Sequence, residues 1–160
     1  MTKKILKINS KKLPIIGLIA LIIYLLIRTL FTHIVINISD SHMGTVFWKS
    51  DKSPEKNDFV YFNFQHELLP KNLKVLSKKI VCIGGESLKI DDQFITCQDK
   101  KYPIKRNKKT GSGKTIKQFY YDDIVPQNKA ILWGSNIESF DSRYWGFIDY
   151  NKLNKMKLIW

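Results

Sequence analysis

Arginine is scarce in this 160-residue sequence: only Arg28, Arg106 and Arg143 stand among 27 basic residues, although the net charge is +13. Lysine, which supplies the rest, is a hydrated point charge that recognises phosphate less well than the forked guanidinium group of Arg. The basic residues are also spread along the chain, and no nucleic-acid-binding motif accompanies them. We therefore expect no nucleic acid partner, and a basic domain that contacts DNA or acidic lipid is kept as an alternative.

Acidic residues are absent before Asp40, whereas five lysines precede an apolar run at residues 13–31. Apart from Arg28 and Thr29, this run is apolar. A helix of this length rises about 28 Å, which is close to the roughly 30 Å of membrane hydrocarbon. By the positive-inside rule, the lysines stay in the cytoplasm. The predicted parts are a cytoplasmic N-terminus, a transmembrane anchor and an extracytoplasmic domain, at residues 1–12, 13–32 and 33–160.

A small-x-small cleavage site is missing after the apolar run, where the sequence reads RTLFTHIVINIS. A cleaved secretory signal peptide needs such a site and has a shorter apolar region. We therefore predict an uncleaved anchor in a single-pass protein of the cytoplasmic (inner) membrane, in contact with the lipid bilayer, and cleavage of this segment is the alternative.

Sustained 3.6-residue periodicity is absent after the apolar run, so helices there should be few and short. Short runs rich in β-branched and aromatic residues predict strands, and Asp91-Asp92 predicts the turn of a hairpin. Residues 100–117 form the most polar region and predict an exposed loop. The expected fold is mainly β. The predicted strands lie at residues 33–39, 46–48, 59–64, 73–83, 119–125, 130–133 and 147–150, and the predicted hairpin covers residues 87–97.

No cofactor or metal is expected. Residues 110–115 (TGSGKT) superficially suggest a phosphate-binding loop, but Lys108 occupies the place where that motif needs its first Gly. Cys82 and Cys97 would both lie outside the membrane in an oxidising compartment. They form either a disulfide or two unpaired, buried thiols.

Serines occur in three segments, at residues 37–45 (NISDSHMGT), 77–86 (SKKIVCIGGE) and 134–146 (GSNIESFDSRYWG), and the second segment also contains Lys78 and Lys79. A serine hydroxyl is a poor nucleophile until a neighbouring base removes its proton. A neutral lysine can be that base, because burial among apolar residues lowers the pKa of Lys from its ordinary value of about 10.4. Lys78 lies between LKVL and IVCI. It is therefore the candidate base, unless Lys78 and Lys79 are both solvated strand residues.

In this order, behind an apolar helix, the segments resemble the boxes S-x-S-M-x-P-T, K-R-V-V-x-x-P-G-D and G-D-N-x-x-x-S-x-D-S-R-x-x-G of the type I signal peptidases. Residues 39–45 align with the first box without a gap, with His42 in place of Met and Gly44 in place of Pro. The third box is the closest match. The other departures are Lys79 for Arg, Gly84 for Pro, Glu86 for Asp and Ser135 for Asp.

The resemblance implies a serine–lysine peptidase in which Ser41 is the nucleophile and Lys78 is the general base. The hydroxyl of Ser39 and the N–H of Ser41 would form the oxyanion hole. The hydroxyl of Ser139 would hydrogen-bond and orient Lys78. An ion pair between Asp141 and Arg143 would support the site.

By the same resemblance, the outer domain would be a signal-peptidase-like antiparallel β domain. The protein would be a membrane-anchored serine endopeptidase that cleaves the signal or leader peptide of a membrane-bound preprotein, or a pilin precursor, at the outer face of the membrane. The short chain and the pattern Asn37-x-Ser39-x-Ser41 are similar to the TraF-type branch of conjugative transfer. The alternative is a non-catalytic, membrane-tethered assembly protein of a secretion or conjugation system.

Overall fold

The computed structural model describes residues 13–37, 45–105, 109, 113 and 115–159. It divides into two units, which meet between Ile34 and Val35. The first unit contains one helix, α1 (Leu13–His33). Its stretch Pro14–His33 has a mean hydropathy of 2.4 and no buried residue, so its length and composition make it a candidate membrane span.

The start of the first strand differs from the prediction. We predicted a strand from residue 33, but His33 still belongs to α1, and β1 covers Ile34–Ile36. Once a helix has formed, each further residue adds a hydrogen bond without a new nucleation step, so the helix extends up to the β-branched residues that follow it. The end of the predicted strand, residues 38–39, lies outside the described residues.

The second unit contains two β-sheets, and the prediction of a mainly β fold with few short helices is confirmed. The larger sheet has seven strands in the order β1-β2-β11-β3-β4-β9-β10. The pairs that β2, β3, β4, β9, β10 and β11 form within it are antiparallel. Its remaining strands are β2 (Val46–Lys49), β3 (Phe59–Asn63), β4 (Val75–Ile83), β9 (Lys129–Trp133), β10 (Ile148–Asp149) and β11 (Asn154–Leu158).

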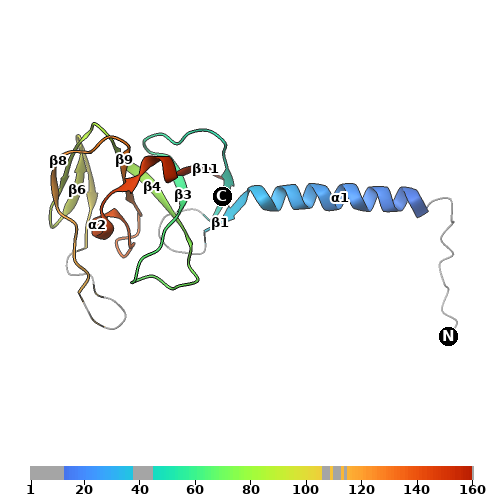
Figure 1. Ribbon diagram of the computed structural model, residues 1–160, viewed down its shortest axis with the longest axis horizontal. Coiled ribbons are helices and arrows are strands. Elements are labelled where there is room, and N and C mark those ends of the chain that lie inside the picture. Colours follow the sequence, from blue (N-terminus) through green and yellow to red (C-terminus); the bar gives the residue numbers. More distant parts are fainter. Residues whose placement is uncertain (1–12, 38–44, 106–108, 110–112, 114, 160) are drawn as a thin grey trace. The chain divides into compact units, whose positions relative to one another are not determined.

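The smaller sheet has four strands in the order β7-β6-β5-β8, all paired antiparallel. Figure 1 shows β6 and β8 at one end of the β domain and β11 at the other, with β4 and β9 between them. Short helical turns, α2 (Ser142–Trp145) and η2 (Tyr150–Lys152), follow β9 and β10. The four strands are β5 (Ser87–Ile90), β6 (Phe94–Cys97), β7 (Lys100–Pro103) and β8 (Tyr121–Ile124).

Two strands lie where the sequence predicted none. The first, β7, lies inside residues 100–117, which we predicted as a loop, and it pairs with β6. It is an edge strand with mostly exposed side chains, so it lacks the apolar alternation that marks a half-buried strand. The second, β11, was not predicted at all. Met156 is its only buried residue, although it lies between β2 and β3 in the middle of the larger sheet.

The central strand β4 contributes to both hydrophobic clusters of the domain. Ile80 packs with Val60 and Phe62 of β3, whereas Val81 packs with residues of the smaller sheet, because successive side chains of a strand point to opposite faces. The register with β9 shifts between Ile80 and Cys82. Cys82 therefore belongs to the same cluster as Val81.

A disulfide joins the two sheets. Cys82 of β4 and Cys97 of β6 are bonded, their Cα atoms are 5.7 Å apart, and neither residue is exposed. The hairpin that brings Cys97 back turns where we predicted, at Asp91, whose carboxylate accepts the backbone N–H groups of Gln93 and Phe94. Those hydrogen bonds lower the pKa of Asp91. Of the two alternatives for the cysteines, the disulfide is the one formed.

Candidate active site

Lys78 lies in the middle of β4 and is 2% exposed. Directly opposite it on β3 is Val60, which is fully buried. Ile80, two residues further along β4, shares the face of Lys78 and is also fully buried. The neighbouring Lys79 points to the other face and is only half-buried. Of the two lysines, therefore, Lys78 is the one held among apolar side chains.

A pocket of about 330 Å³ opens beside this lysine, and we call it the Lys78 pocket. Strand β1, the β3–β4 connection, β4 and the loop after β9 each contribute to its lining. Apolar side chains dominate the lining, which suits an apolar ligand group of modest size. The lining residues include Val35, Ile36, Asn37, Leu73, Leu76 and Phe140.

The expected nucleophile and oxyanion residue, Ser41 and Ser39, lie outside the described residues. The structure does describe the residues on both sides of that segment. The N–H of Asn37 donates to the carbonyl of Thr45 over 2.8 Å. Asn37, which precedes that segment in the sequence, also lines the Lys78 pocket.

An ion pair with no exposed side-chain surface follows β9. Two hydrogen bonds link Arg143 to Asp141, Nε to Oδ1 over 2.7 Å and Nη2 to Oδ2 over 2.5 Å. Asp141 also accepts the N–H of Gly134 over 2.7 Å. The ion pair that we expected between these two residues is thus formed, and its carboxylate is fixed to the first residue of the loop.

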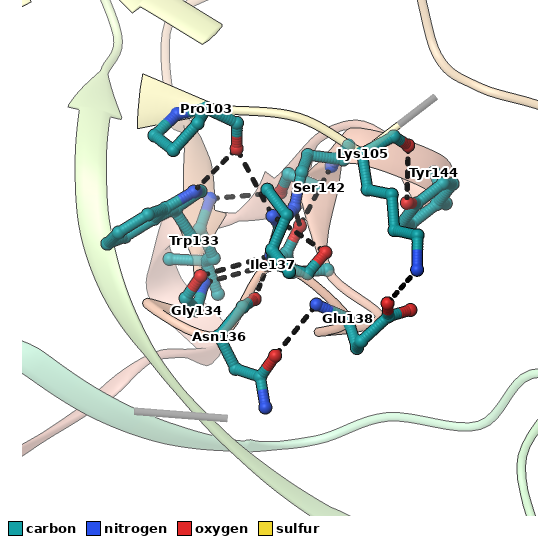
Figure 2. Close-up of polar contacts among 12 residues, drawn as sticks. Pro103, Lys105, Trp133, Gly134, Asn136, Ile137, Glu138, Ser142 and Tyr144 are labelled. Atoms are coloured by element: carbon teal, nitrogen blue, oxygen red, sulfur yellow. Dashed lines mark hydrogen bonds and ion pairs between the residues drawn. The ribbon is translucent and has the colours of Figure 1, made fainter. Parts of the chain in front are cut away.

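The guanidinium group of Arg143 donates to the main-chain carbonyl groups of four residues, Pro103, Gly134, Asn136 and Ile137, which are labelled in Figure 2. Nη2 donates to Gly134 and Asn136, and Nη1 to Pro103 and Ile137. A buried charge is costly unless it is paired and hydrogen-bonded, and both conditions are met here. Only Arg has the number of donors and the planar fork that this arrangement requires. The loop at residues 134–141 is therefore closed around one side chain.

Ser139 lies inside that loop and is 5% exposed. Among the residues that the structure describes, none forms a hydrogen bond with its Oγ. The hydrogen bond that we expected from Ser139 to Lys78 is therefore not made in this structure. A buried hydroxyl without a partner is rare in native structures and often marks a functional site.

The sequence did not point to Ser142 or Phe140. The Oγ of Ser142 accepts the N–H of Leu132 over 2.9 Å, which ties α2 to β9. Phe140 forms part of the wall of the Lys78 pocket. Both residues lie within the third segment, between Ser139 and Arg143, so their position in that segment was the available signal.

One group in the described chain has metal-ligand chemistry: Cys82, Glu86 and Cys97 place their ligand atoms within 4.8 Å of one another. The two sulfur atoms are bonded to each other, and Lys56 pairs with the Glu86 carboxylate over 2.5 Å. The carboxylate also accepts the N–H of Ile83. These donors are thus committed to protein contacts, and Glu86 closes the turn after β4.

Comparison with known proteins identifies the family of this chain. The sequence profile described as "Signal peptidase, peptidase S26" matches residues 10–160. The chain belongs to this signal peptidase family. Membership makes the protein a hydrolase, a serine peptidase of the signal peptidase type, with preproteins as its class of substrate.

A solved structure is also similar to this signal peptidase. It is the crystal structure of a signal peptidase I from Enterococcus faecalis V583, with 19% sequence identity and a TM-score of 0.43. The similarity covers 68% of this chain and 99% of that one. None of the curated proteins matches the chain.

Proposed function

We propose that this signal peptidase is anchored in the cytoplasmic membrane by α1 and cleaves preproteins at the outer face, with Ser41 as nucleophile and Lys78 as general base. The observation that carries the proposal is the burial of Lys78 beside a pocket that Asn37 also lines. Ser41 is four residues from Asn37, and four residues span at most about 14 Å. This chain length is compatible with the proposed attack by Ser41 at the pocket.

The surroundings of Lys78 favour the neutral amine that a base requires. Val60 and Ile80 are fully buried beside it, and removal from water disfavours the ammonium form. A neutral amine can accept the proton of a serine hydroxyl, whereas an ammonium group cannot. Lys79 has the same chemistry but points to the other face of β4, so we assign it no role in catalysis.

The proposed reaction proceeds through an acyl-enzyme. Lys78 accepts the proton of the Ser41 hydroxyl while Oγ attacks the scissile carbonyl carbon. The N–H of Ser41 and the hydroxyl of Ser39 stabilise the oxyanion; one such donor is typically worth about 100- to 1000-fold in rate. The C–N bond then breaks, and the leaving amine takes the proton from Lys78. Water, activated by the same amine, hydrolyses the ester and regenerates Ser41.

The unpaired hydroxyl of Ser139 fits a supporting role in this cycle. It is buried, and it lies in the loop that the Asp141–Arg143 pair holds in place. We propose that Ser139 hydrogen-bonds Lys78 when substrate is bound, because catalytic hydrogen bonds often form only in that complex. The ion pair then acts as a positioning element that keeps the loop beside β4.

The Lys78 pocket supplies the place for substrate side chains next to the cleavage site. Its largely apolar lining and its volume of about 330 Å³ suit small apolar groups. The edge strand β1 lies along it, since Val35 and Ile36 are lining residues. The substrate would therefore add to this edge as a further strand, a mode in which main-chain hydrogen bonds give affinity and pockets give specificity.

The anchor places this chemistry where preprotein transmembrane segments end. The helix α1 has the length and composition of a membrane span, and tethering an enzyme beside its substrate raises the effective concentration. A dedicated pilin precursor is a narrower candidate substrate, favoured by the pattern Asn37-x-Ser39-x-Ser41. In that case a substrate amine, rather than water, would attack the acyl-enzyme and give a cyclic product.

The competing proposal is a membrane-tethered assembly protein without catalysis. The replacement of Pro by Gly44 in the first segment favours it. The buried Lys78 and the unpaired Ser139 favour the enzyme instead, because an inactive protein gains nothing from either.

The test is cleavage of a purified, membrane-embedded preprotein by the full chain in nanodiscs, followed by intact-mass spectrometry. We expect wild type and the surface control Ser53→Ala to cleave and Ser41→Ala to leave the precursor intact. Hydrolysis gives two products whose masses sum to the mass of the precursor plus one water. Cyclisation gives a product that is one water lighter than the corresponding hydrolysis product. Cleavage by Ser41→Ala at the wild-type rate would refute the assignment. Binding of precursor without cleavage by any variant would support the assembly protein.

A further inference from the structure

The Lys78 pocket has a smaller neighbour on the other side of Phe140. This second hollow, which we call the aromatic pocket, has a volume of about 250 Å³ and is lined by residues that include Leu68, Ile116, Lys117, Phe140 and Tyr144. We infer that the aromatic pocket binds one aromatic or large aliphatic side chain of the same peptide whose cleavage site occupies the Lys78 pocket. This inference rests on the proposed function and adds a second point of specificity to it.

The two pockets are neighbours, because one residue contributes to the lining of both. Phe140 lines both of them. A third hollow, around Gln65 and Pro70, shares Leu69 and Leu73 with the Lys78 pocket and His66 with the aromatic pocket. The hollows therefore follow the β3–β4 connection on more than one side. A peptide in the Lys78 pocket reaches the aromatic pocket by passing Phe140.

Aromatic rings that pack against one another form the walls of the aromatic pocket. The rings of Phe140 and Tyr144 are stacked, with centroids 5.8 Å apart and planes 14° from parallel. His66 packs edge-on against Phe140 at 5.0 Å and stacks on Phe64 at 6.2 Å. Tyr144 follows Arg143 directly, so the buried ion pair fixes its backbone. Such a platform favours aromatic and large apolar groups over small ones.

The size and charge of the aromatic pocket restrict its occupant further. At about 250 Å³ it is smaller than the roughly 300–1,000 Å³ of typical small-molecule sites, so it suits one side chain. Glu67 and Lys117, of opposite charge, both line it, so neither sign of charge is selected. Burial raises the pKa of Tyr144, which therefore stays an uncharged phenol at neutral pH. An uncharged, apolar side chain is the occupant that these features fit.

The geometry of an extended peptide gives the inference a positional signature. Successive side chains of a strand point to opposite sides, so residues at even separations face the same way. A side chain in the aromatic pocket should stand at one fixed separation along the peptide from the one in the Lys78 pocket, so that a single position shows the effect.

The first experiment measures cleavage of alanine-based peptides in which a single Phe replaces Ala at each position in turn, by the full chain in nanodiscs. We expect one position where Phe raises kcat/KM roughly 10-fold over Ala, the scale of burying one large side chain. Filling the pocket by Leu68→Trp or Ile116→Trp should bring the ratio of kcat/KM for the Phe peptide to kcat/KM for the Ala peptide close to one. The control Ile124→Trp, on an exposed residue of β8, should keep the wild-type ratio. A ratio near one at every position, or one unchanged in both filled variants, would overturn the inference.

A second experiment separates this inference from the proposed function. The same peptides, with benzoylphenylalanine in place of Phe, are photo-cross-linked to Ser41→Ala, and the adducts are mapped by mass spectrometry. We expect adducts at residues 115–117 and Tyr144 from one peptide position, abolished by Leu68→Trp. If wild type cleaves no peptide but these adducts form, the proposed function fails and the pocket stands. If cleavage depends on Ser41 but adducts are scattered over the surface, the function stands and the pocket fails.

Discussion

The two sheets of the β domain differ in how far the ionisable side chains around them are buried. Around the seven-stranded sheet, Lys78 is 2% exposed and both Asp141 and Arg143 are fully buried. In the four-stranded sheet, the ion pair Lys89–Asp122 lies at the surface with both side chains more than half exposed. Burial of ionisable side chains is costly, and their concentration around one sheet is a reason why we propose the active site there. The four-stranded sheet, stapled by its disulfide, is better explained as a scaffold.

The largest difference in cleavage activity should be found between variants of two adjacent lysines of β4. Lys78→Met should lower kcat/KM for preprotein cleavage by about 10²- to 10⁴-fold, because it removes the proposed general base and leaves an apolar side chain of similar length. Lys79→Met, on the opposite face, should stay near wild type. Steady-state cleavage assays measure both, and near-UV circular dichroism checks that the fold is kept. Equal losses in the two variants would mean that β4, rather than one amine, is what matters.

The buried ion pair should have the next largest effect. Arg143→Met leaves Asp141 charged and unpaired without exposure to water, so the free energy of unfolding should fall by about 3–5 kcal/mol, and cleavage should fall with it as the loop loosens. Lys105→Met, which breaks the exposed pair of Lys105 with Glu138 in the same region, should cost at most about 1 kcal/mol. Urea unfolding gives both values. A loss for Arg143→Met no greater than that for Lys105→Met would contradict the positioning role of the pair.

Removal of the disulfide should affect stability but spare the active site. Cys82 and Cys97 are 15 residues apart in sequence, and a loop of that length corresponds to about 3 kcal/mol in the chain-entropy model. The double variant Cys82→Ser/Cys97→Ser should therefore unfold at lower urea concentration while its kcat/KM, measured well below the unfolding midpoint, stays within about twofold of wild type. A large loss of activity in the folded variant would show that the four-stranded sheet is more than a scaffold.

The smallest effect concerns an exposed ion pair at the edge of the larger sheet. Hydrogen bonds from Lys129 and Lys152 lower the pKa of Asp149 to about 2 from an ordinary 3.8. Because the folded-state pKa is the lower one, any stabilisation by this group is present above about pH 4 and is lost as the pH falls toward 2. Carboxyl carbon NMR should show this titration, and Lys129→Met should move it back toward 3.8. An unshifted titration in wild type would show that the pairs do not persist in solution.

Much of the fold could be predicted because apolar alternation marks half-buried strands. The strand at residues 59–64 and the turn at Asp91 follow directly from such patterns. Strand β11 could not be found in this way, since Met156 is its only buried residue and its place between β2 and β3 is a matter of long-range pairing. Strand β7 was missed because an exposed edge strand has the composition of a loop.

The candidate site was predicted in part. The resemblance pointed to Lys78 and to the Asp141–Arg143 pair, but the sequence left open whether Lys78 is buried or whether Lys78 and Lys79 are both solvated strand residues. Only the register of β4 against β3 decides that. The Lys78 pocket combines β1, the β3–β4 connection and Phe140, which lie far apart in sequence, so no local pattern could define it.

The most direct test of the central claim is to replace the amine of Lys78 by a weaker one. In Lys78→Cys, the new thiol is the one to alkylate, because Cys82 and Cys97 are bonded to each other. Alkylation with bromoethylamine in urea without reductant, followed by refolding, rebuilds a lysine-like side chain whose amine is less basic. If Lys78 is the general base, activity lost in Lys78→Cys returns, and the rise of kcat/KM with pH occurs at lower pH than in wild type. Full activity in unmodified Lys78→Cys, or a pH profile identical to wild type after rescue, would contradict it.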